Sequence, residues 1–401
     1  MIAANPLSQV RSHAVPDSGD RPPYSIRISE ETDDPAWDAF LAETPGGHHV
    51  QTSLWAQVKA SMGWLATRVV VSDRHGIVAG GQILFFRVPV VGRCGYVSKG
   101  PVLAVDDSTL AELVITRLRE VAAEHRCRVL FVQPPNNGQS LAPALRSCGF
   151  GDSPLEGAPT ATVLVDLTID LDDIVGRMSK GKRNGVRRTE RNGISVRQGT
   201  ETDLATFHRL LVATSERRGF TPFAEVYIRE IWRALSPRGH ARVFIAEYED
   251  EAVAAQLVVP FGDTVIAKQA GWSGRYGQRR PNEALDWATI KWAKAHGYRH
   301  YDLDGIDAQA AEMITQGGDL PESMRKSPTY YKIGFGGEVR LLPETQWYIF
   351  NPLLRILYKS GLRRISGWLC KGNALDFVRM RRLGSFRSRF HGHMVSDRAT
   401  V

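Results

Sequence analysis

Apolar residues along this chain recur with two spacings. At 108–125 they return every third or fourth position, which predicts an amphipathic helix with Ser108 as its N-cap. Shorter apolar runs with β-branched and aromatic residues, such as 77–87, predict strands. In the first half these patterns predict helices at 35–41, 52–61 and 108–125, and strands at 64–72, 77–87, 94–103 and 128–133.

The second half repeats this order of elements. It carries helix patterns at 203–218, 224–235 and 281–296, and strand patterns at 242–249, 251–260, 264–271 and 298–304. Each half also closes on a Gly-Phe pair, at 149–150 and at 334–335. Internal duplication is the economical interpretation. The alternative is coincidence, because many α/β proteins share this order of elements.

A strand meander followed by a long helix and a further strand is typical of the GNAT class of N-acyltransferases. The sequence therefore predicts an α/β (α+β) fold with two tandem GNAT-like N-acyltransferase subdomains and a basic helical C-terminal extension. The predicted divisions are a disordered tail at 1–23, a first subdomain at 24–166, a second at 167–345, the helical extension at 346–384 and a disordered tail at 385–401.

Composition limits the class of protein. Of 401 residues, 43% are hydrophobic and 23% are charged, as in ordinary folded soluble proteins. No stretch approaches the roughly 20 apolar residues that span a bilayer. Residues 1–20 have no apolar segment of the kind found in signal peptides. We therefore expect a cytoplasmic protein.

The four cysteines form no Cys-x-x-Cys pair and have no partnered histidine spacing. We expect buried free thiols in a reducing compartment. This pattern predicts no metal site and argues against a secreted disulfide scaffold. The cysteines are Cys94, Cys127, Cys148 and Cys370.

The net charge is +8 and the sequence pI is about 9.4. Such a balance favours a polyanionic partner: tRNA, a nucleotide diphosphate or an anionic lipid surface. A solvated basic surface without a specific partner explains the charge equally well, so the distribution of cations decides more than their number.

The segment YYKIGFGG at 330–337 holds the clearest candidate chemistry. It places Lys332 beside two tyrosines and a glycine turn, an arrangement suited to an anionic substrate or a developing oxyanion. A lysine that caps a surface turn is the structural alternative. The preceding strand carries Asp302 and Asp304, and either carboxylate is a candidate to accept a proton. Carboxylates at strand ends are also often structural.

In GNAT enzymes a glycine-rich loop opens the long helix and cradles the pyrophosphate of coenzyme A. This chain has QRRPNEA at 278–284 in that place. Pro281 has no N–H to donate, and Glu283 adds negative charge. The segment disfavours an acyl-CoA donor, and we predict no bound cofactor.

Six segments stand in one order over about residues 40–355. They are QTSLWAQVK at 51–59, YVSKGP at 96–101, KGKRNGVRR at 180–188, TSERRGF at 214–220, YDLDGI at 301–306 and the Lys332 segment. Together they resemble the FemXAB family of aminoacyl-tRNA-dependent transferases, which build peptidoglycan interpeptide bridges. The resemblance implies two adjoining acyltransferase-like subdomains with the site in their cleft. Because only residues 218–242 separate one helix from the meander, we expect the type without a long helical arm.

The resemblance also implies roles for individual residues. Lys59 corresponds to a lysine that binds the acceptor's diphosphate, and Arg217 to a second diphosphate ligand. Arg218 is the alternative to Arg217, because a register error of one residue is easy here. Tyr96, in the YVSKGP segment, is a further substrate-binding candidate.

Two residues of the YYKIGFGG segment have counterparts in the family. Lys332 corresponds to the site lysine and is our candidate for charge stabilisation. Tyr331 corresponds to the neighbouring aromatic residue, which would pack on the terminal adenosine or the aminoacyl group.

Two clusters of cations are further candidates for binding an anionic partner. At 180–191 they favour contact with tRNA or with the acceptor's phosphates, although a solvated charged face is the default. A second basic zone at 363–382 follows an apolar stretch at 347–358, which predicts core packing or docking to an anionic membrane. The candidates for tRNA or phosphate contact are Lys180, Lys182, Arg183 and Arg187.

These observations predict a monomeric aminoacyltransferase. It would move an amino acid from charged tRNA to an amine of a peptidoglycan precursor, a lipid-linked or nucleotide-linked muropeptide, with aminoacyl-tRNA as co-substrate. Three alternatives are open: a tRNA-dependent enzyme that tailors a natural product, an acyl-CoA N-acyltransferase, and a non-catalytic RNA-binding module.

Overall fold

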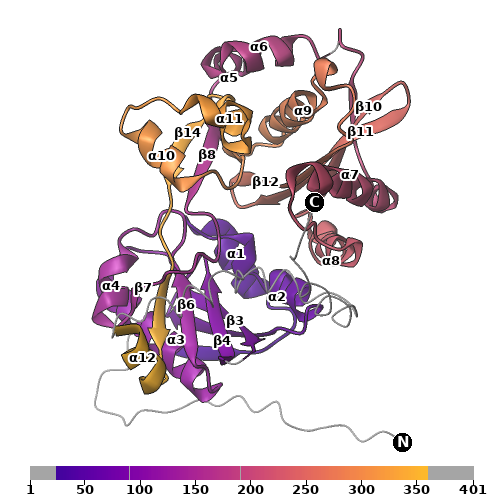
Figure 1. Cartoon of the computed structure of the whole chain (residues 1–401). Helices are drawn as coiled ribbons and strands as arrows, with labels where there is room; N and C mark the ends of the chain where they lie inside the picture. Colours follow the sequence, from indigo (N-terminus) through magenta and orange to yellow (C-terminus); the bar gives the residue numbers. More distant parts are fainter. Residues whose placement is uncertain (1–23, 90, 190, 360–401) are drawn as a thin grey trace, which may run out of the picture.

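The computed structural model of this chain describes residues 24–89, 91–189 and 191–359, which form two β-sheets with surrounding helices (Figure 1). The first sheet has the strand order β1-β2-β3-β4-β6-β15-β7, with β5 beside β3. Its only parallel pair among these strands is β4 and β6. The strands are β1 (Ser25–Ser29), β2 (Leu65–Asp73), β3 (Gly76–Val88), β4 (Gly92–Ser98), β5 (Val102–Leu103), β6 (Val129–Gln133), β7 (Gly151–Asp152) and β15 (Gln346–Ile349).

The second sheet repeats this plan in the order β14-β8-β13-β12-β11-β10-β9. Here β12 and β13 are the parallel pair, and the other neighbours are antiparallel. The shared plan supports the predicted duplication. The strands are β8 (Ala161–Asp166), β9 (Ser195–Gln198), β10 (Arg242–Tyr248), β11 (Glu251–Phe261), β12 (Thr264–Trp272), β13 (His300–Asp302) and β14 (Glu338–Leu341).

The two sheets exchange one strand each. β8 follows β7 of the first sheet along the chain, yet it lies between β13 and β14 of the second. In return, β15 follows β14 of the second sheet and lies between β6 and β7 of the first. Figure 1 shows β8 in magenta among the orange elements of the upper sheet, and the golden segment near α12 beside the lower sheet.

The predicted boundaries at 166 and 346 are therefore wrong. Residues 161–166 belong to the second sheet, and residues 346–349 are a strand of the first sheet rather than the start of a helical extension. The short helix α12 (Pro352–Lys359) follows that strand. The rest of the predicted extension and both predicted tails lie outside the described residues.

Helices cover the sheets where the apolar periodicity predicts them. On α3 the side chains of Leu110, Val114, Leu118 and Val121 are buried against the first sheet. Asp107 rather than Ser108 caps this helix, because its carboxylate accepts the N–H groups of the first turn. The helices are α1 (Pro35–Glu43), α2 (Ser53–Ala60), α3 (Ser108–Glu124), α4 (Leu141–Ser147), α5 (Leu171–Arg177), α6 (Lys180–Arg187), α7 (Leu204–Arg218), α8 (Glu225–Leu235), α9 (Pro281–Ala295), α10 (Ala308–Thr315) and α11 (Pro328–Ile333).

The predicted strand at 94–103 is interrupted. β4 ends at Ser98 and β5 begins at Val102. Between them the backbone of Lys99 has φ 53°, in the left-handed region. The chain therefore leaves the sheet at Lys99, which places this residue at the end of β4.

One hydrophobic cluster joins the two subdomains. Trp55 and Val58 of α2 pack in the same core as Phe207 of α7 and Ile231 of α8. Apolar burial of this extent opposes separation of the two halves. The shared core therefore decides which polar side chains of the first subdomain face those of the second.

The connection between α7 and β10 contains α8 and the 3₁₀ turn η3 (Ser236–Arg238). Within this fully described segment there is no long helical arm, which confirms the predicted type. Among the described residues, no helix is both long enough and apolar enough to cross a membrane.

Candidate active site

The candidate site lies where the two parallel strands of the second sheet, β12 and β13, separate. β12 and β13 pair from Thr264 and His300 to Ile266 and Asp302. β13 ends there, whereas β12 continues to Trp272. The residues after β13 therefore leave the sheet, while the neighbouring β12 continues. Asp302 lies where the two strands separate.

Asp302 is a buried carboxylate with two hydrogen bonds. The hydroxyl of Thr162 donates to it, and the backbone N–H of Asp304 donates to its Oδ1 at 2.8 Å. Burial raises the pKa of Asp302 to about 6, and the negative charge of Asp304 acts in the same direction. Asp304 has φ 59°, so the chain turns sharply between the two carboxylates.

Lys332 reaches this turn from α11. Ser327 caps the helix by accepting the N–H of Tyr330, and the ammonium of Lys332 donates a hydrogen bond to the carbonyl of Gly305 at 2.7 Å. Burial lowers the pKa of Lys332, and the carboxylates of Asp304 and Asp302 oppose that shift. The structure thus brings together Lys332, Asp302 and Asp304, the three predicted catalytic residues.

Lys99 of the first subdomain adds a second cation that the sequence analysis did not single out. Only 4% of its surface is exposed, and its ammonium donates to the carbonyl of Pro159 at 3.2 Å. Burial lowers the pKa of Lys99 to about 8, although the carboxylates of Asp302 and Asp304 act against this shift. The sequence could have indicated Lys99, because this lysine stands in the YVSKGP segment, at the end of a predicted strand and before Gly-Pro.

Further cations follow the subdomain interface away from this cluster. The Lys268 ammonium lies 5.9 Å from the centre of the Trp55 ring, and its charge helps to lower the pKa of Lys99. The Lys59 ammonium lies 5.3 Å from the same ring. We call Lys59, Lys268 and Lys99 the lysine row, because Lys59 and Lys268 share the Trp55 ring and Lys268 acts electrostatically on Lys99.

Lys59 itself stands among aromatic rings from both subdomains. Its ammonium lies 5.3 Å from the ring centre of Trp64 and 5.1 Å from that of Tyr227 on α8, and it donates to the Tyr227 hydroxyl at 3.0 Å. Rings hold an ammonium by their negative faces without neutralising its charge. The arrangement therefore positions Lys59 between the two subdomains.

A buried polar network supports α11 from behind. The hydroxyls of Tyr331 and Tyr301 each donate to Asp286, at 2.7 Å in both cases. The Lys182 ammonium lies 3.0 Å from the centre of the Tyr331 ring and pairs with Glu283 at 3.1 Å. The network fixes Tyr331, and with it the adjoining Lys332, relative to the long helix α9.

Comparisons with known proteins agree with this architecture. The FemAB family model matches residues 32–143, and a model described as an acetyltransferase (GNAT) domain matches residues 177–311. The solved structure described as FemX superimposes with a TM-score of 0.71 at 20% identity, over 80% of this chain and 97% of that one. The predicted resemblance to the FemXAB family is confirmed. The predicted GNAT-like fold is likewise confirmed.

Two curated relatives of this chain share one name. The lipid II:glycine glycyltransferase of Staphylococcus epidermidis is 28% identical over 227 residues, which are 54% of this chain and 55% of that protein. The protein of the same name from Staphylococcus aureus is 25% identical over 314 residues, 74% of each chain. The match to the first of these relatives thus spans only about half of its length.

Two predicted ligand residues are buried with their polar groups engaged by other side chains, and both predictions are corrected. Lys182 was expected to contact tRNA or phosphate, yet it is buried beneath Tyr331 and paired with Glu283. Tyr96 was expected to bind substrate, yet it is buried and donates to the amide oxygen of Gln133 at 2.8 Å. Lys182 is buried because α6 packs on α9. Tyr96 is buried because the chain around Gly157 lies against its hydroxyl.

Other predicted ligands lie at the surface but apart from the Lys332 cluster. The guanidinium of Arg217 lies 4.9 Å from the ring centre of Trp272 at the end of β12. Arg218 donates to the carbonyl of Lys326 at 3.2 Å, on the segment that leads into α11. Arg218 thus contacts the segment before α11, while Arg217 contacts β12.

The basic helix α6 presents the remaining predicted cations. Lys180 and Arg187 are exposed, and the partly exposed Arg183 donates to the carbonyl of Gly176 at 3.1 Å. The turn at Gly336 holds this segment in place. Gly336 has φ 73°, and a β-carbon there would collide with the carbonyl oxygen of Arg177. The YYKIGFGG segment therefore positions the basic helix as well as Lys332.

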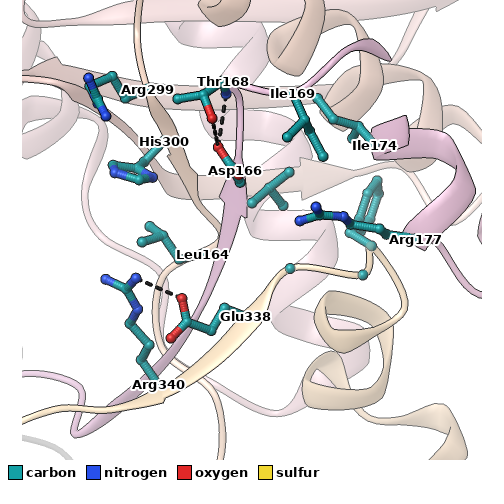
Figure 2. A pocket seen from close by; sticks show the side chains of 14 residues that line it. Leu164, Asp166, Thr168, Ile169, Ile174, Arg177, Arg299, His300, Glu338 and Arg340 are labelled. Atoms are coloured by element: carbon teal, nitrogen blue, oxygen red, sulfur yellow. Dashed lines mark hydrogen bonds and ion pairs between the residues drawn. The ribbon is translucent and has the colours of Figure 1, made fainter. Parts of the chain in front are cut away.

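A cavity of about 290 Å³ is lined in part by that glycine turn (Figure 2). Its walls include Arg177 of α5, Arg299 and Arg340. The two carboxylates drawn in it are engaged, Asp166 with Thr168 and Glu338 with Arg340. Lys332, Asp302 and Asp304 do not line it, so this cavity is separate from the candidate site.

Proposed function

We propose that this chain transfers an aminoacyl group from charged tRNA to an amine of a peptidoglycan precursor. The observation that carries the proposal is the buried ammonium of Lys332, held by the carbonyl of Gly305 beside Asp302 and Asp304. Similarity to the FemXAB family and the glycyltransferase names of its relatives support the same reaction.

The reaction needs no enzyme nucleophile, because an aminoacyl ester is already activated. The neutral amine of the acceptor attacks the ester carbonyl carbon, and negative charge develops on the carbonyl oxygen. Lys332 stabilises that oxyanion, as a preorganised cation in a water-poor site does. The ester C–O bond then breaks and the amide bond remains.

The proton of the amine passes to a carboxylate and then to the leaving ribose hydroxyl. Asp302, whose pKa is raised to about 6 by burial, is a stronger base than an ordinary aspartate and is ionised at neutral pH. Asp304, less buried and next to it, is the alternative acceptor. The carboxylate that takes the proton gives it up to the leaving hydroxyl, so both aspartates are ionised again after each turnover.

The lysine row explains how a long acceptor would lie. Lys59 would bind the diphosphate, since a compact ammonium suits phosphate oxygens. Lys268 and Lys99 continue along the interface from Trp55 toward Asp302. An acceptor held by its diphosphate at one end would thus present its amine near Lys332 at the other.

The start of α9 supports tRNA rather than acyl-CoA as the donor. A GNAT enzyme would bind the pyrophosphate of coenzyme A at this helix N-terminus. Here the buried Glu283 occupies the first turn and pairs with Lys182 of α6 and with Arg280. This ion-paired carboxylate, with α6 packed over it, occupies the place where the pyrophosphate would bind.

The test supplies purified chain with charged tRNA pools and either lipid II or the nucleotide-linked muropeptide. The expected product is the acceptor heavier by one aminoacyl residue, and ribonuclease treatment of the tRNA abolishes it. Transfer from acetyl-CoA but not from tRNA would overturn the proposal. Transfer only to amino sugars or small peptides would replace the acceptor by a natural product.

A further inference from the structure

One end of the first sheet gathers parts of the chain that are far apart in sequence. The register aligns Phe86, Cys94, Val129 and Ile349 in a single row across β3, β4, β6 and β15. Residues beyond this row therefore lie at the same end of the sheet: the hairpin between β3 and β4, the residues before β6, and α12. A hydrogen bond from the N–H of Phe350 to the carbonyl of Arg128 at 2.9 Å ties two of these parts together.

Apolar side chains are exposed at this end. On α12, Leu353 and Ile356 are 69% and 62% exposed. Leu65 starts β2 opposite Phe85 and is 58% exposed, and Pro89 is exposed in the hairpin. Leu65, Pro89 and the two residues of α12 are far apart in the sequence, and the register places them at one end of the sheet. Exposed apolar residues gathered at one end indicate an interaction surface.

Arginines line a hollow at the same end. The hollow has a volume of about 550 Å³ and is formed by the start of β4 and the turn between α3 and β6. Among the described residues, Glu124 is the one carboxylate that lines it, and it already pairs with Arg117 at 3.3 Å. Its positive charge is therefore not neutralised from within. The arginines are Arg87, Arg93, Arg126 and Arg128.

We propose that this end of the first sheet docks on an anionic lipid bilayer. We call it the docking end: exposed Leu65, Pro89, Leu353 and Ile356 around Arg87, Arg93, Arg126 and Arg128. Apolar side chains enter the interface between headgroups and acyl chains, while neighbouring arginines bind anionic headgroups. A nucleic acid offers phosphates for the arginines but no apolar layer for the exposed side chains, so the observations favour a membrane.

The docking end also adjoins the predicted diphosphate ligand. Trp64, next to Leu65, stacks on Phe86 with ring centres 4.5 Å apart, and the Lys59 ammonium lies 5.3 Å from the Trp64 ring. If the proposed function holds, on which this step rests, Lys59 binds the acceptor's diphosphate close to the membrane. A lipid-linked acceptor would then keep its chain in the bilayer while its peptide follows the lysine row, which selects the lipid-linked over the nucleotide-linked muropeptide.

Vesicle co-sedimentation of the full chain tests the docking end. Vesicles that contain phosphatidylglycerol should bind the chain, and vesicles of phosphatidylcholine alone should bind it far less. The pairs Leu353→Ser with Ile356→Ser and Arg126→Ser with Arg128→Ser should each weaken binding about tenfold or more. The matched control is Arg229→Ser with Arg233→Ser, which removes the same charge from the exposed side of α8 and should leave binding unchanged.

Three outcomes would overturn the proposal: equal binding of both vesicle types, equal loss in the control, or arginine variants that lose tRNA binding but not vesicle binding. Activity on the water-soluble nucleotide-linked precursor separates this proposal from the proposed function. The docking variants should retain that activity, while their activity on lipid II in vesicles falls. A chain that binds vesicles as described but transfers nothing would contradict only the proposed function.

Discussion

The Lys332 ammonium donates a hydrogen bond to the carbonyl of Gly305 at 2.7 Å, which joins α11 to the turn that follows β13. Asp302 and Asp304 lie on that same turn and act on the charge of Lys332. The lysine is therefore held both by a neutral acceptor and by the field of two carboxylates. Such a fixed cation is what stabilisation of an oxyanion requires.

Replacing Lys332 by Met should lower kcat roughly a hundredfold, because the variant loses the charge and keeps a side chain of similar length. The KM for the acceptor should change little. Steady-state kinetics with charged tRNA and a soluble muropeptide measure both constants. Lys291→Met, at an exposed position of α9, is the matched control and should behave like the parent chain. A loss confined to KM would show that Lys332 binds the acceptor instead.

Replacing Asp302 by Asn should make the fold more stable above pH 6. The folded state raises the pKa of Asp302 to about 6, so between about pH 4 and pH 6 it holds a proton that the unfolded chain has lost. The free energy of unfolding of the parent chain therefore falls as pH rises through this window, by up to about 3 kcal/mol for a shift of this size.

The asparagine keeps an oxygen that can accept from Thr162 and from the N–H of Asp304, and it has no proton to lose. Urea unfolding at several pH values should show that the decline disappears in the variant, while transferase activity falls. A variant less stable than the parent at pH 8 would show instead that the attraction of Lys332 and Lys99 for the carboxylate outweighs its burial.

Replacing Lys59 by Met should raise the KM for the acceptor about tenfold with kcat nearly unchanged. The variant loses a charged contact to the diphosphate, which contributes equally to the bound substrate and the transition state. Titration with the isolated nucleotide-linked muropeptide gives the affinity directly. Tyr227→Phe removes only the hydroxyl that accepts from Lys59 and should have a smaller effect in the same direction. Unchanged acceptor affinity in Lys59→Met would contradict the assignment.

Replacing Lys182 by Met should reduce the free energy of unfolding by about 3 kcal/mol, since Glu283 is left buried without its ammonium partner. The double change Lys182→Met with Glu283→Gln should recover much of that loss. A phosphate ligand would behave differently: its removal would weaken tRNA binding and reduce the salt dependence of that binding, with little change in stability. Denaturant unfolding and tRNA titration on the same samples distinguish the two roles.

Much of the fold follows from local pattern. The periodicity at 108–125 predicts α3 because one stripe of that helix is buried, and Pro281 marks the start of α9 because proline fits the first turn. The meander β10–β11–β12 was predictable because its strands are consecutive and joined by short turns. The YYKIGFGG and YDLDGI segments pointed to Lys332, Asp302 and Asp304 for the same reason, since each lies at the end of a recognisable element.

Tertiary structure alone decided the rest. β8 and β15 have the alternation of any half-buried strand, and nothing within them states which sheet will pair with them. Lys182 has the same local spacing as the exposed cations around it, and only the packing of α6 on α9 buries it. Lys99 meets the catalytic candidates only across the subdomain interface. Sequence thus determined the elements and the chemical groups, whereas long-range pairing and burial decided which groups share a site and which are taken into the core.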